Sequence, residues 1–399
     1  MAASLLLRDV RLPGTGAVDI AVLDGRIAAI GPALTVPPGT PTVDGAGELA
    51  LPGLVDGHAH LDKTLWGTPW HPHQAGPSIA ERIANERRVL AALDLSPQQQ
   101  SARLLAHLVA RGTTHVRTHV DIAPELGLAH LHGVQATAAA WHDAVDIQIV
   151  AFPQCGVMIR PGTLDLLDQA AREGAALLGG LDPIGIDGDP TGQLDALFAI
   201  AARRGCGIDI HLHDRGEAGA ATIDRIAERT AALGLAGRVA VSHAFCLGEL
   251  EPARLEPLVD RLLDNDIAVM THGPAGRVPF PPIRRLAERG VRLFTGSDGV
   301  RDAWTPLNTG DMLERAYLLA YCSGFREDDD LALALRMATF GGAQVIGAER
   351  YGLEVGADAD LVLVAAENEA EAVALHPPRR LVLKRGRVVA RDGACLFTT

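Results

Sequence analysis

Short apolar segments alternate with amphipathic segments through most of the middle of this 399-residue chain. The apolar segments predict strands, and the segments between them carry apolar residues three or four positions apart, which predicts helices. Because a strand, a helix and a further strand pack as a right-handed parallel unit, the alternation predicts a parallel sheet covered by helices. The expected strands include 114–120, 147–152, 207–211, 239–243, 267–270 and 291–295, and the expected helices include 97–111, 128–141, 194–204, 223–233 and 282–289.

An open, doubly wound sheet and a closed barrel both produce this alternation, and the positions of the polar residues distinguish between them. Polar residues stand at the carboxyl ends of several different expected strands, namely Gln154, His211, His243 and Asp298. Chemical groups contributed by the ends of many strands are typical of a (β/α)8 barrel. The sequence therefore predicts an α/β fold, with a (β/α)8 TIM-type barrel as the catalytic domain over residues 51–346.

The two ends of the chain have a different pattern. Short runs with strand character, separated by Gly, Pro and Asp-Gly turns, occupy 5–10, 19–23, 25–30, 360–364, 380–384 and 387–389. We expect residues 1–50 and 347–399 to form one small β-sandwich domain beside the barrel.

Composition excludes several classes of function. A net charge of −13 without a cluster of basic residues argues against nucleic acid and anionic membranes as partners. No apolar run approaches the ~18 residues of a membrane span, and the first residues lack the pattern of a signal peptide. The five cysteines are scattered without CxxC spacing, which fits a reducing compartment. We expect a cytoplasmic enzyme that acts on a small molecule.

His58 and His60 stand two residues apart, between a Pro-Gly pair and Asp62. Because side chains alternate along a strand, these two imidazoles point to the same side. Two imidazoles directed to one point at the mouth of a barrel can bind a divalent metal ion. A pair of surface histidines in a loop is the alternative, and the flanking residues favour the metal site.

The order of these residues along the chain carries more information than any one of them. The stretches 58–62, 115–121, 146–154, 242–243, 296–298 and 304–307 resemble the amidohydrolase superfamily, specifically its cytosine deaminase branch, and the resemblance covers nearly the whole chain. It implies that one divalent metal ion is held by His58, His60, His211 and Asp298. It also implies that His243 lies beside the activated water or the substrate, and that Gln154 holds the amide edge of a heterocycle.

The two lysines bear on the number of metal ions. Binuclear members of the superfamily bridge two metals with a carboxylated lysine, or sometimes a glutamate, on a middle barrel strand. Lys63 directly follows the His-x-His segment and Lys384 lies in the terminal β-domain, so neither fits the bridging position. We therefore expect a mononuclear site, for which Zn²⁺, Fe²⁺ and Mn²⁺ are all suitable.

In the expected reaction, a metal-activated water attacks a ring carbon that bears an exocyclic amine. Asp298 would accept the proton of the water, and His243 would polarise the attacked carbon or hold the nucleophile. A second acid would protonate the leaving amine. The cytosine deaminase branch has a glutamate three residues after the middle histidine, where this chain has Asp214. We expect Asp214 or Glu217 to deliver the proton, with no catalytic role for either as the alternative.

Other positions bear on the substrate. Gly299 stands where the branch typically has a second aspartate that contacts the substrate, so we expect a substrate larger than cytosine or differently substituted. His119 is expected to line the pocket floor or to support the metal ligands, although a satisfied buried histidine fits equally well. Trp70 lies in the loop after the His-x-His segment and could stack on a planar ring.

The predicted function is hydrolytic deamination of an aminated nitrogen heterocycle, with release of ammonia. One alternative keeps the metal site but releases an N-alkylamine from a triazine-like ring, or opens a cyclic amide. A second alternative is a non-catalytic binding homologue, against which the complete set of metal-binding residues argues. Barrels of this family are commonly oligomeric, so we expect a homo-oligomer.

Overall fold

The computed structural model describes residues 4–274, 276 and 278–398. Strands and helices alternate through its middle, as predicted. The strands there are β5 (Leu54–Ala59), β6 (Thr113–Asp121), β7 (Asp146–Phe152), β8 (Leu177–Leu181), β9 (Gly207–His211), β10 (Val239–Ser242), β11 (Ile267–Met270) and β12 (Leu293–Phe294). The helices are α1 (Ile79–Leu93), α2 (Pro97–Ala110), α3 (Ala129–Trp141), α4 (Thr163–Arg172), α5 (Pro190–Arg204), α6 (Gly216–Ala232), α7 (Pro252–Asp264), α8 (Ile283–Arg289), α9 (Met312–Ser323), α10 (Asp328–Arg336) and α11 (Gly342–Ile346), with short helical turns η1 (Phe245–Gly248) and η2 (Met337–Gly341).

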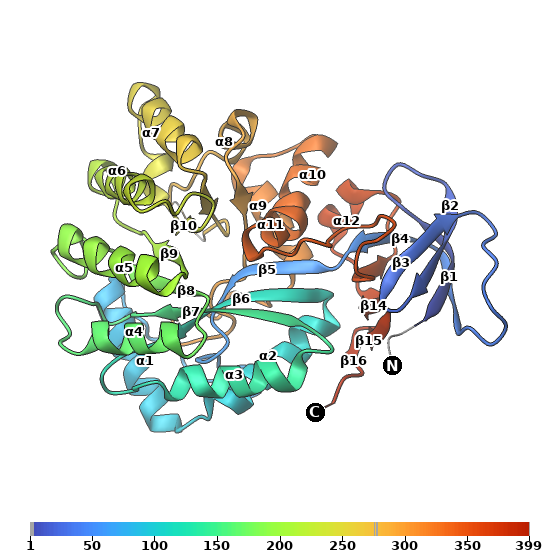
Figure 1. Ribbon diagram of the computed structural model, residues 1–399, viewed down its shortest axis with the longest axis horizontal. Coiled ribbons are helices and arrows are strands. Elements are labelled where there is room, and N and C mark those ends of the chain that lie inside the picture. Colours follow the sequence, from blue (N-terminus) through green and yellow to red (C-terminus); the bar gives the residue numbers. More distant parts are fainter. Residues whose placement is uncertain (1–3, 275, 277, 399) are drawn as a thin grey trace.

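The eight strands form a parallel sheet in the order β12-β11-β10-β9-β8-β7-β6-β5, and helices pack around it (Figure 1). The segments at its two edges also meet. Ala59 pairs in parallel with Asp298, and the amide of Gly57 donates to the carbonyl of Thr295. The sheet therefore closes into the predicted (β/α)8 barrel.

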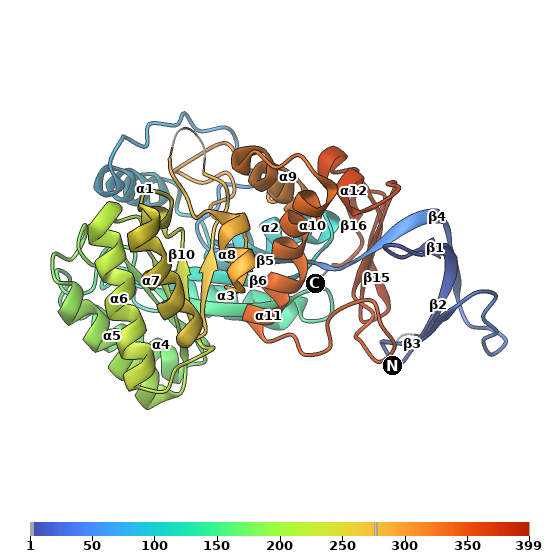
Figure 2. The same cartoon turned by 90° about the horizontal axis from the view of Figure 1, so that it is seen from above.

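The two chain ends together form the expected β-domain. Its strands are β1 (Leu5–Arg11), β2 (Ala17–Leu23), β3 (Arg26–Gly31), β4 (Thr42–Pro52), β13 (Leu361–Val364), β14 (Arg379–Lys384), β15 (Arg387–Arg391) and β16 (Ala394–Cys395), and α12 (Glu369–Leu375) lies between β13 and β14. The strands are hydrogen-bonded in the order β16-β15-β14-β13-β4-β1-β2-β3, so β4 and β13 join the two ends of the chain. Figures 1 and 2 show this domain at one end of the long axis of the molecule.

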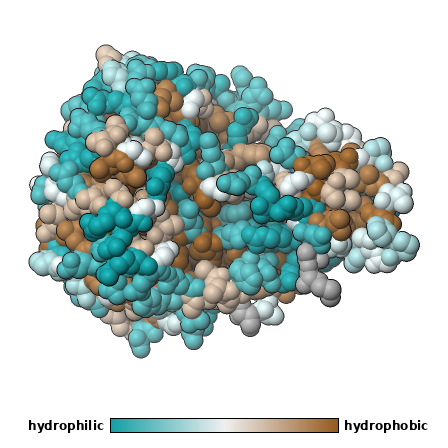
Figure 3. Space-filling view, viewed as in Figure 1, coloured by the Kyte–Doolittle hydropathy of each residue, from teal (hydrophilic) through white to brown (hydrophobic). Residues whose placement is uncertain are grey.

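Burial follows from this arrangement. Every residue of β5, β6 and β9 is buried, because barrel strands are covered by helices outside and packed by side chains inside. Polar residues on these strands must therefore pair with one another or bind a ligand. In the face shown in Figure 3 the barrel surface is mostly hydrophilic, and hydrophobic residues gather on the terminal β-domain at the right. Within the described residues, no helix combines the length and the apolar character that crossing a membrane requires.

Candidate metal-dependent active site

The side chains expected to bind a metal meet at the carboxyl ends of the barrel strands. His58 lies in β5 and His60 directly follows that strand, while His211 ends β9 and Asp298 lies just beyond β12. The Nε2 atoms of His60 and His211 are 3.4 Å apart. Asp298 Oδ1 lies 3.3 Å from His60 Nε2 and 3.7 Å from His58 Nε2. The fold thus gathers donors from three segments that are remote in the sequence.

These distances and protonation states fit a bound cation. Donor atoms that lie ~2.1 Å from a tetrahedral zinc ion are roughly 3.4 Å from one another. His58 Nε2 is buried and has no hydrogen-bond partner among the described residues. Burial lowers the pKa of His58 and of His211 well below the usual value, so both imidazoles are neutral, the form that binds a metal. His58, His60, His211 and Asp298 would hold one divalent ion.

A chain of hydrogen bonds behind His58 determines which of its nitrogens faces the metal position. His58 Nδ1 lies 3.0 Å from Ser242 Oγ, and Ser242 Oγ donates to Asp209 Oδ1 over 2.6 Å. Asp209 also accepts from Arg117, whose Nη1 lies 3.1 Å from Oδ2. Because the serine proton goes to the carboxylate, Ser242 accepts the Nδ1 proton of His58. The lone pair of His58 is then on Nε2.

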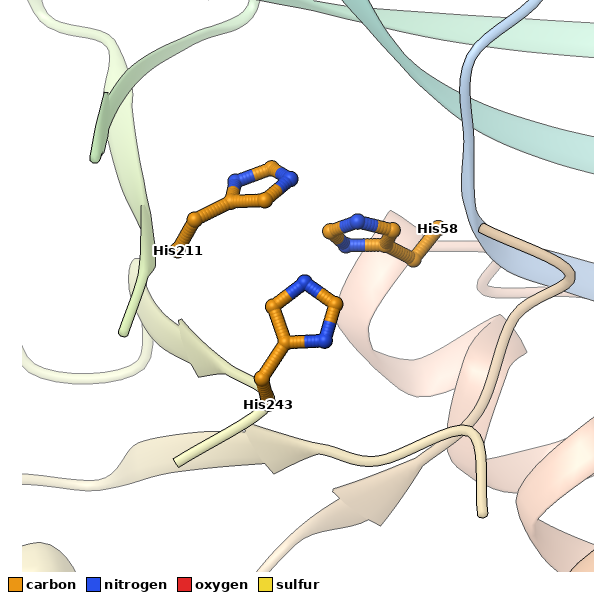
Figure 4. A group of neighbouring side chains, drawn as sticks. All are labelled: His58, His211 and His243. Carbon is orange, nitrogen blue, oxygen red and sulfur yellow. The ribbon is translucent and has the colours of Figure 1, made fainter. Parts of the chain in front are cut away.

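His243 follows β10 and stands beside two of the expected ligands. Figure 4 shows the rings of His58, His211 and His243 directed toward a common centre from different strands. His243 Nδ1 lies 3.3 Å from His272 Nδ1, whereas Nε2 is buried without a partner in the described part of the chain. The ring of His213 stacks on His243 with centroids 4.4 Å apart. His243 thus presents an unpaired nitrogen beside the metal position.

A cavity of about 770 Å³ opens over these residues. Its lining includes His60, His211, His243 and Asp298, together with apolar side chains, among them Ile79, Leu181, Phe245, Leu307 and Leu318. Concave sites with mostly apolar walls and a few convergent polar groups are typical of small-molecule binding.

A buried polar cluster with Lys63 at its centre forms one side of the cavity. Lys63 Nζ lies 3.1 Å from Asp121 Oδ1 and 3.5 Å from Glu86 Oε1, and it also donates to the side-chain oxygen of Gln154. The amide nitrogen of Gln154 donates to Glu86 and, over 3.4 Å, to Asp121 Oδ2. Burial raises the pKa of Glu86 to about 8. Gln154, expected to hold the substrate, lines the cavity with its amide already oriented by three protein groups.

The family model described as "Amidohydrolase family" matches residues 91–390, which is more than half of the chain. The chain belongs to the amidohydrolase family. It is 35% identical over 376 residues to the uncharacterized protein YahJ of Escherichia coli K12, covering 93% of this chain and 81% of that protein. It is 30% identical to N-isopropylammelide isopropyl amidohydrolase of Pseudomonas sp. strain ADP, covering 88% of each chain.

Solved structures of related hydrolases and deaminases are also similar to this amidohydrolase. The crystal structure of N-isopropylammelide isopropylaminohydrolase from Burkholderia multivorans matches with a TM-score of 0.96 and 49% identity, covering 99% of this chain and 100% of that chain. That of 5-methylcytosine deaminase from Klebsiella pneumoniae matches with a TM-score of 0.86 and 25% identity, covering 97% of both chains. The expected resemblance to cytosine-deaminase-like amidohydrolases is confirmed, and the protein is a hydrolase acting on C–N bonds.

The carboxylates expected to transfer protons lie away from the cavity of this amidohydrolase. Asp214 accepts the backbone amides of Ile184 at 3.1 Å and Gly185 at 3.0 Å, so it holds the loop after β8. Glu217 is exposed in the first turn of α6 and pairs with Arg254 at 2.9 Å. Neither is among the described residues that line the cavity. The fold does not bring these two carboxylates to the metal-binding residues.

His119 lies behind the metal-binding residues. Its side chain is fully buried, and its ring centroid is 4.0 Å from that of His58. Both of its ring nitrogens lack hydrogen-bond partners within the described chain, and Asp209 Oδ2 is 3.7 Å from its Nε2. His58, His119 and Asp209 have the spacing of metal ligands, but Asp209 is already paired with Arg117.

The aromatic side chains that line the cavity, among them Phe152, Phe245 and Trp304, do not include the expected Trp70. Trp70 is 63% exposed and lies against the guanidinium of Arg301, whereas Trp304 lines the cavity. Gly299 lines it too, as expected. Lys63 and Glu86 also line or support the cavity wall and were not predicted from the sequence. Lys63 carried a signal, since it is one of only two lysines and follows the His-x-His segment, whereas Glu86 carried none.

Proposed function

We propose that this protein is a mononuclear metal-dependent hydrolase that removes an alkylamine from a ring carbon of an oxygen-substituted nitrogen heterocycle. The observation that carries the proposal is the cavity of about 770 Å³, which joins the metal-binding residues to apolar walls. A single unsubstituted ring leaves most of this volume empty, whereas an N-alkyl group fills it and buries apolar surface.

The residues of the chain divide the chemistry between them. His58, His60, His211 and Asp298 would hold a divalent ion, which when bound would supply Lewis-acid activation of water. Asp298 would accept a proton from the water, and His243 Nε2, which has no partner among the described residues, would orient the attacked carbon or its leaving group. His213 lines the cavity, stacks on His243 and is held by Asp182, 2.9 Å from its Nδ1. This position favours His213 for the proton-delivery role expected of Asp214 or Glu217.

The relatives support removal of an amine and differ in which amine leaves. Proteins named N-isopropylammelide hydrolases include the solved structure with 49% identity to this chain. Relatives named for deaminases are less similar, with 25% identity for the 5-methylcytosine deaminase structure and 27% for a pterin deaminase of Rhizobium rhizogenes. Release of ammonia is therefore the second candidate, and it needs the same metal-binding residues.

The test supplies paired heterocycles that differ only at the leaving amine. Protein reconstituted with Zn²⁺, Fe²⁺ or Mn²⁺ is incubated with N-isopropylammelide and with the same ring bearing a free amino group, and isopropylamine and ammonia are quantified. We expect isopropylamine release with the larger kcat/KM. Asp298→Asn controls for contaminating activity. Faster release of ammonia would favour the deaminase, and no turnover by fully metal-loaded protein would indicate a binding homologue.

A further inference from the structure

The space beside Gly299 is already occupied by another side chain. A Cβ atom added at Gly299 would lie 1.7 Å from Asp302 Oδ2 and 2.6 Å from Asp302 Cγ, far closer than nonbonded atoms approach. The carboxylate of Asp302 therefore stands where a residue-299 side chain would begin. The small residue at position 299 does not open empty volume, because it makes room for this carboxylate.

One half of the Asp302 carboxylate is fixed by the backbone. Oδ1 accepts the amide of Trp304 at 2.8 Å and that of Thr305 at 2.9 Å, which holds the turn after Asp302. The residue is only 4% exposed, so the orientation of its side chain is set by this turn. Oδ2, in contrast, has no hydrogen-bond donor among residues 4–274, 276 and 278–398.

The unpaired oxygen belongs to the cavity wall. Asp302 lines the cavity together with Asp298, Gly299 and Trp304. Charged groups that act on Asp302 include Asp298, Lys63 and Glu86. Lys63 is already bound by Asp121, Glu86 and Gln154. An acceptor at the cavity wall that no described protein group satisfies is free to accept a hydrogen bond from a bound ligand.

We infer that Asp302 is a specificity-determining residue whose Oδ2 accepts a hydrogen bond from a ring N–H of the substrate. The ligand class is a neutral oxo-heterocycle, in which a ring nitrogen carries hydrogen next to a carbonyl carbon. This role rests on the proposed function, since it concerns recognition of that substrate. Asp302 recognises the ring through this hydrogen bond, whereas the apolar walls accommodate the substituent of the ring.

The variant Asp302→Asn separates the two oxygens of the carboxylate. The asparagine oxygen can still accept the amides of Trp304 and Thr305, while the position of Oδ2 becomes an N–H donor that opposes a ring N–H. For N-isopropylammelide we expect kcat/KM to fall by about 10- to 100-fold, the range for a hydrogen bond to a charged group. Analogues methylated at one ring nitrogen at a time identify the N–H that Asp302 binds. The analogue without this N–H should bind the wild type poorly, and Asp302→Asn should not lower its kcat/KM further.

A matched control is Asp187→Asn. Asp187 is 7% exposed and accepts the backbone amides of Val157 and Met158, but it does not line the cavity in the described chain. It should leave discrimination between N–H and N-methyl rings unchanged. Metal content, measured on every variant, should equal that of the wild type, which separates substrate recognition from damage to the metal site.

A second pair of variants tests whether side chains at positions 299 and 302 compete for the same space. Gly299→Asp alone should lower kcat/KM, because its side chain collides with Asp302. Gly299→Asp combined with Asp302→Gly should recover part of the loss shown by Asp302→Gly alone. Wild-type protein that neither binds nor hydrolyses any heterocycle would contradict the proposed function and this role with it. Wild-type hydrolysis of N-isopropylammelide, with unchanged N–H discrimination in Asp302→Asn, would overturn the role of Asp302 alone.

Discussion

Strand β6 carries a buried histidine near each end, and the two surroundings differ in a way that separates a functional site from a structural one. His119, near the carboxyl end, lies among the expected metal ligands, where His58 Nε2 and His243 Nε2 lack partners within the described chain. His115, near the start, lies with Asp146 and Asp360 in a second cluster that also has metal-ligand spacing.

The second cluster already contains its own cation. Lys384 Nζ is fully buried and lies 2.7 Å from Asp146 Oδ2, 2.7 Å from Asp360 Oδ2 and 3.4 Å from His115 Nε2. These contacts join the barrel strands to the terminal β-domain. The cluster around His115 therefore has its charges balanced by Lys384 and is structural. The cluster around His58, His60, His211 and Asp298 keeps unpaired ring nitrogens among the described residues, as a metal site does.

The largest effect is expected from removing one of the four expected metal ligands. His211→Ala should lose most bound metal and lower kcat/KM by ~10³-fold or more, because Lewis-acid activation contributes several kcal/mol. Circular dichroism should show an intact fold. His132→Ala, at an exposed histidine paired with Glu173, is the control. Full metal occupancy and turnover in His211→Ala would remove this residue from the ligand set.

Removing the cation of the cluster around His115 should instead lower the stability of the fold. Lys384→Met leaves buried Asp360 without its cation, so we expect the free energy of unfolding to fall by about 3–5 kcal/mol. Activity per folded molecule should stay unchanged. Arg387→Met, which removes an exposed pair with Asp143, should cost less than about 1 kcal/mol in the same urea titration. Equal losses in the two variants would refute the distinction.

A smaller effect is expected behind the metal position. Ser242→Ala removes the group that accepts the Nδ1 proton of His58, so metal affinity should fall by ~10- to 100-fold. Chelator competition measures this, and the Co²⁺ absorption spectrum reports the altered ligand geometry. Ser242→Thr should retain affinity. Ser101→Ala removes an equally buried hydroxyl in α2 and should have no effect on the metal, whereas a matching loss there would point to general destabilisation.

The smallest effect concerns acid sensitivity. Burial and then Lys384 lower the pKa of His115 to about 4, whereas an unfolded histidine titrates near ~6.5. Below that value the unfolded chain binds a proton that the folded chain does not, so stability falls as pH decreases toward 4. Between pH 6.5 and 5.5 we expect His115 to account for about 1 kcal/mol. Urea unfolding of wild type and His115→Asn should show this difference, and parallel pH dependences would contradict it.

The sequence allowed the barrel and the terminal β-domain to be predicted, because each leaves a local pattern. The residues proposed to bind the metal came from the family resemblance, and the fold brings them together. Helix ends were also close, since α5 ends at Arg204 and α8 at Arg289 as expected. The starts of α5 and α6 were placed several residues late. In α6 the first turns, Gly-Glu-Ala-Gly-Ala-Ala, consist of small residues and one glutamate, without apolar periodicity.

Two other elements had no clear pattern. Strand β8, Leu-Leu-Gly-Gly-Leu, was missed because glycines have low strand propensity, yet a Cβ at Gly180 would lie 2.7 Å from Ile210 Cδ1. Helix α1 was missed because it is rich in charged residues, although Ser78 and Glu81 form a capping box. The positions of Glu86 and Asp302 depend on tertiary packing between remote segments, which no local pattern reports.

Metal stoichiometry tests the central claim most directly. Wild-type protein, His60→Ala and His115→Asn are each reconstituted with Zn²⁺, desalted and analysed by mass spectrometry of metals against protein concentration. We predict one equivalent per chain in the wild type and in His115→Asn, and far less than one in His60→Ala. Two equivalents in the wild type, or loss of the ion in His115→Asn with retention in His60→Ala, would contradict the account.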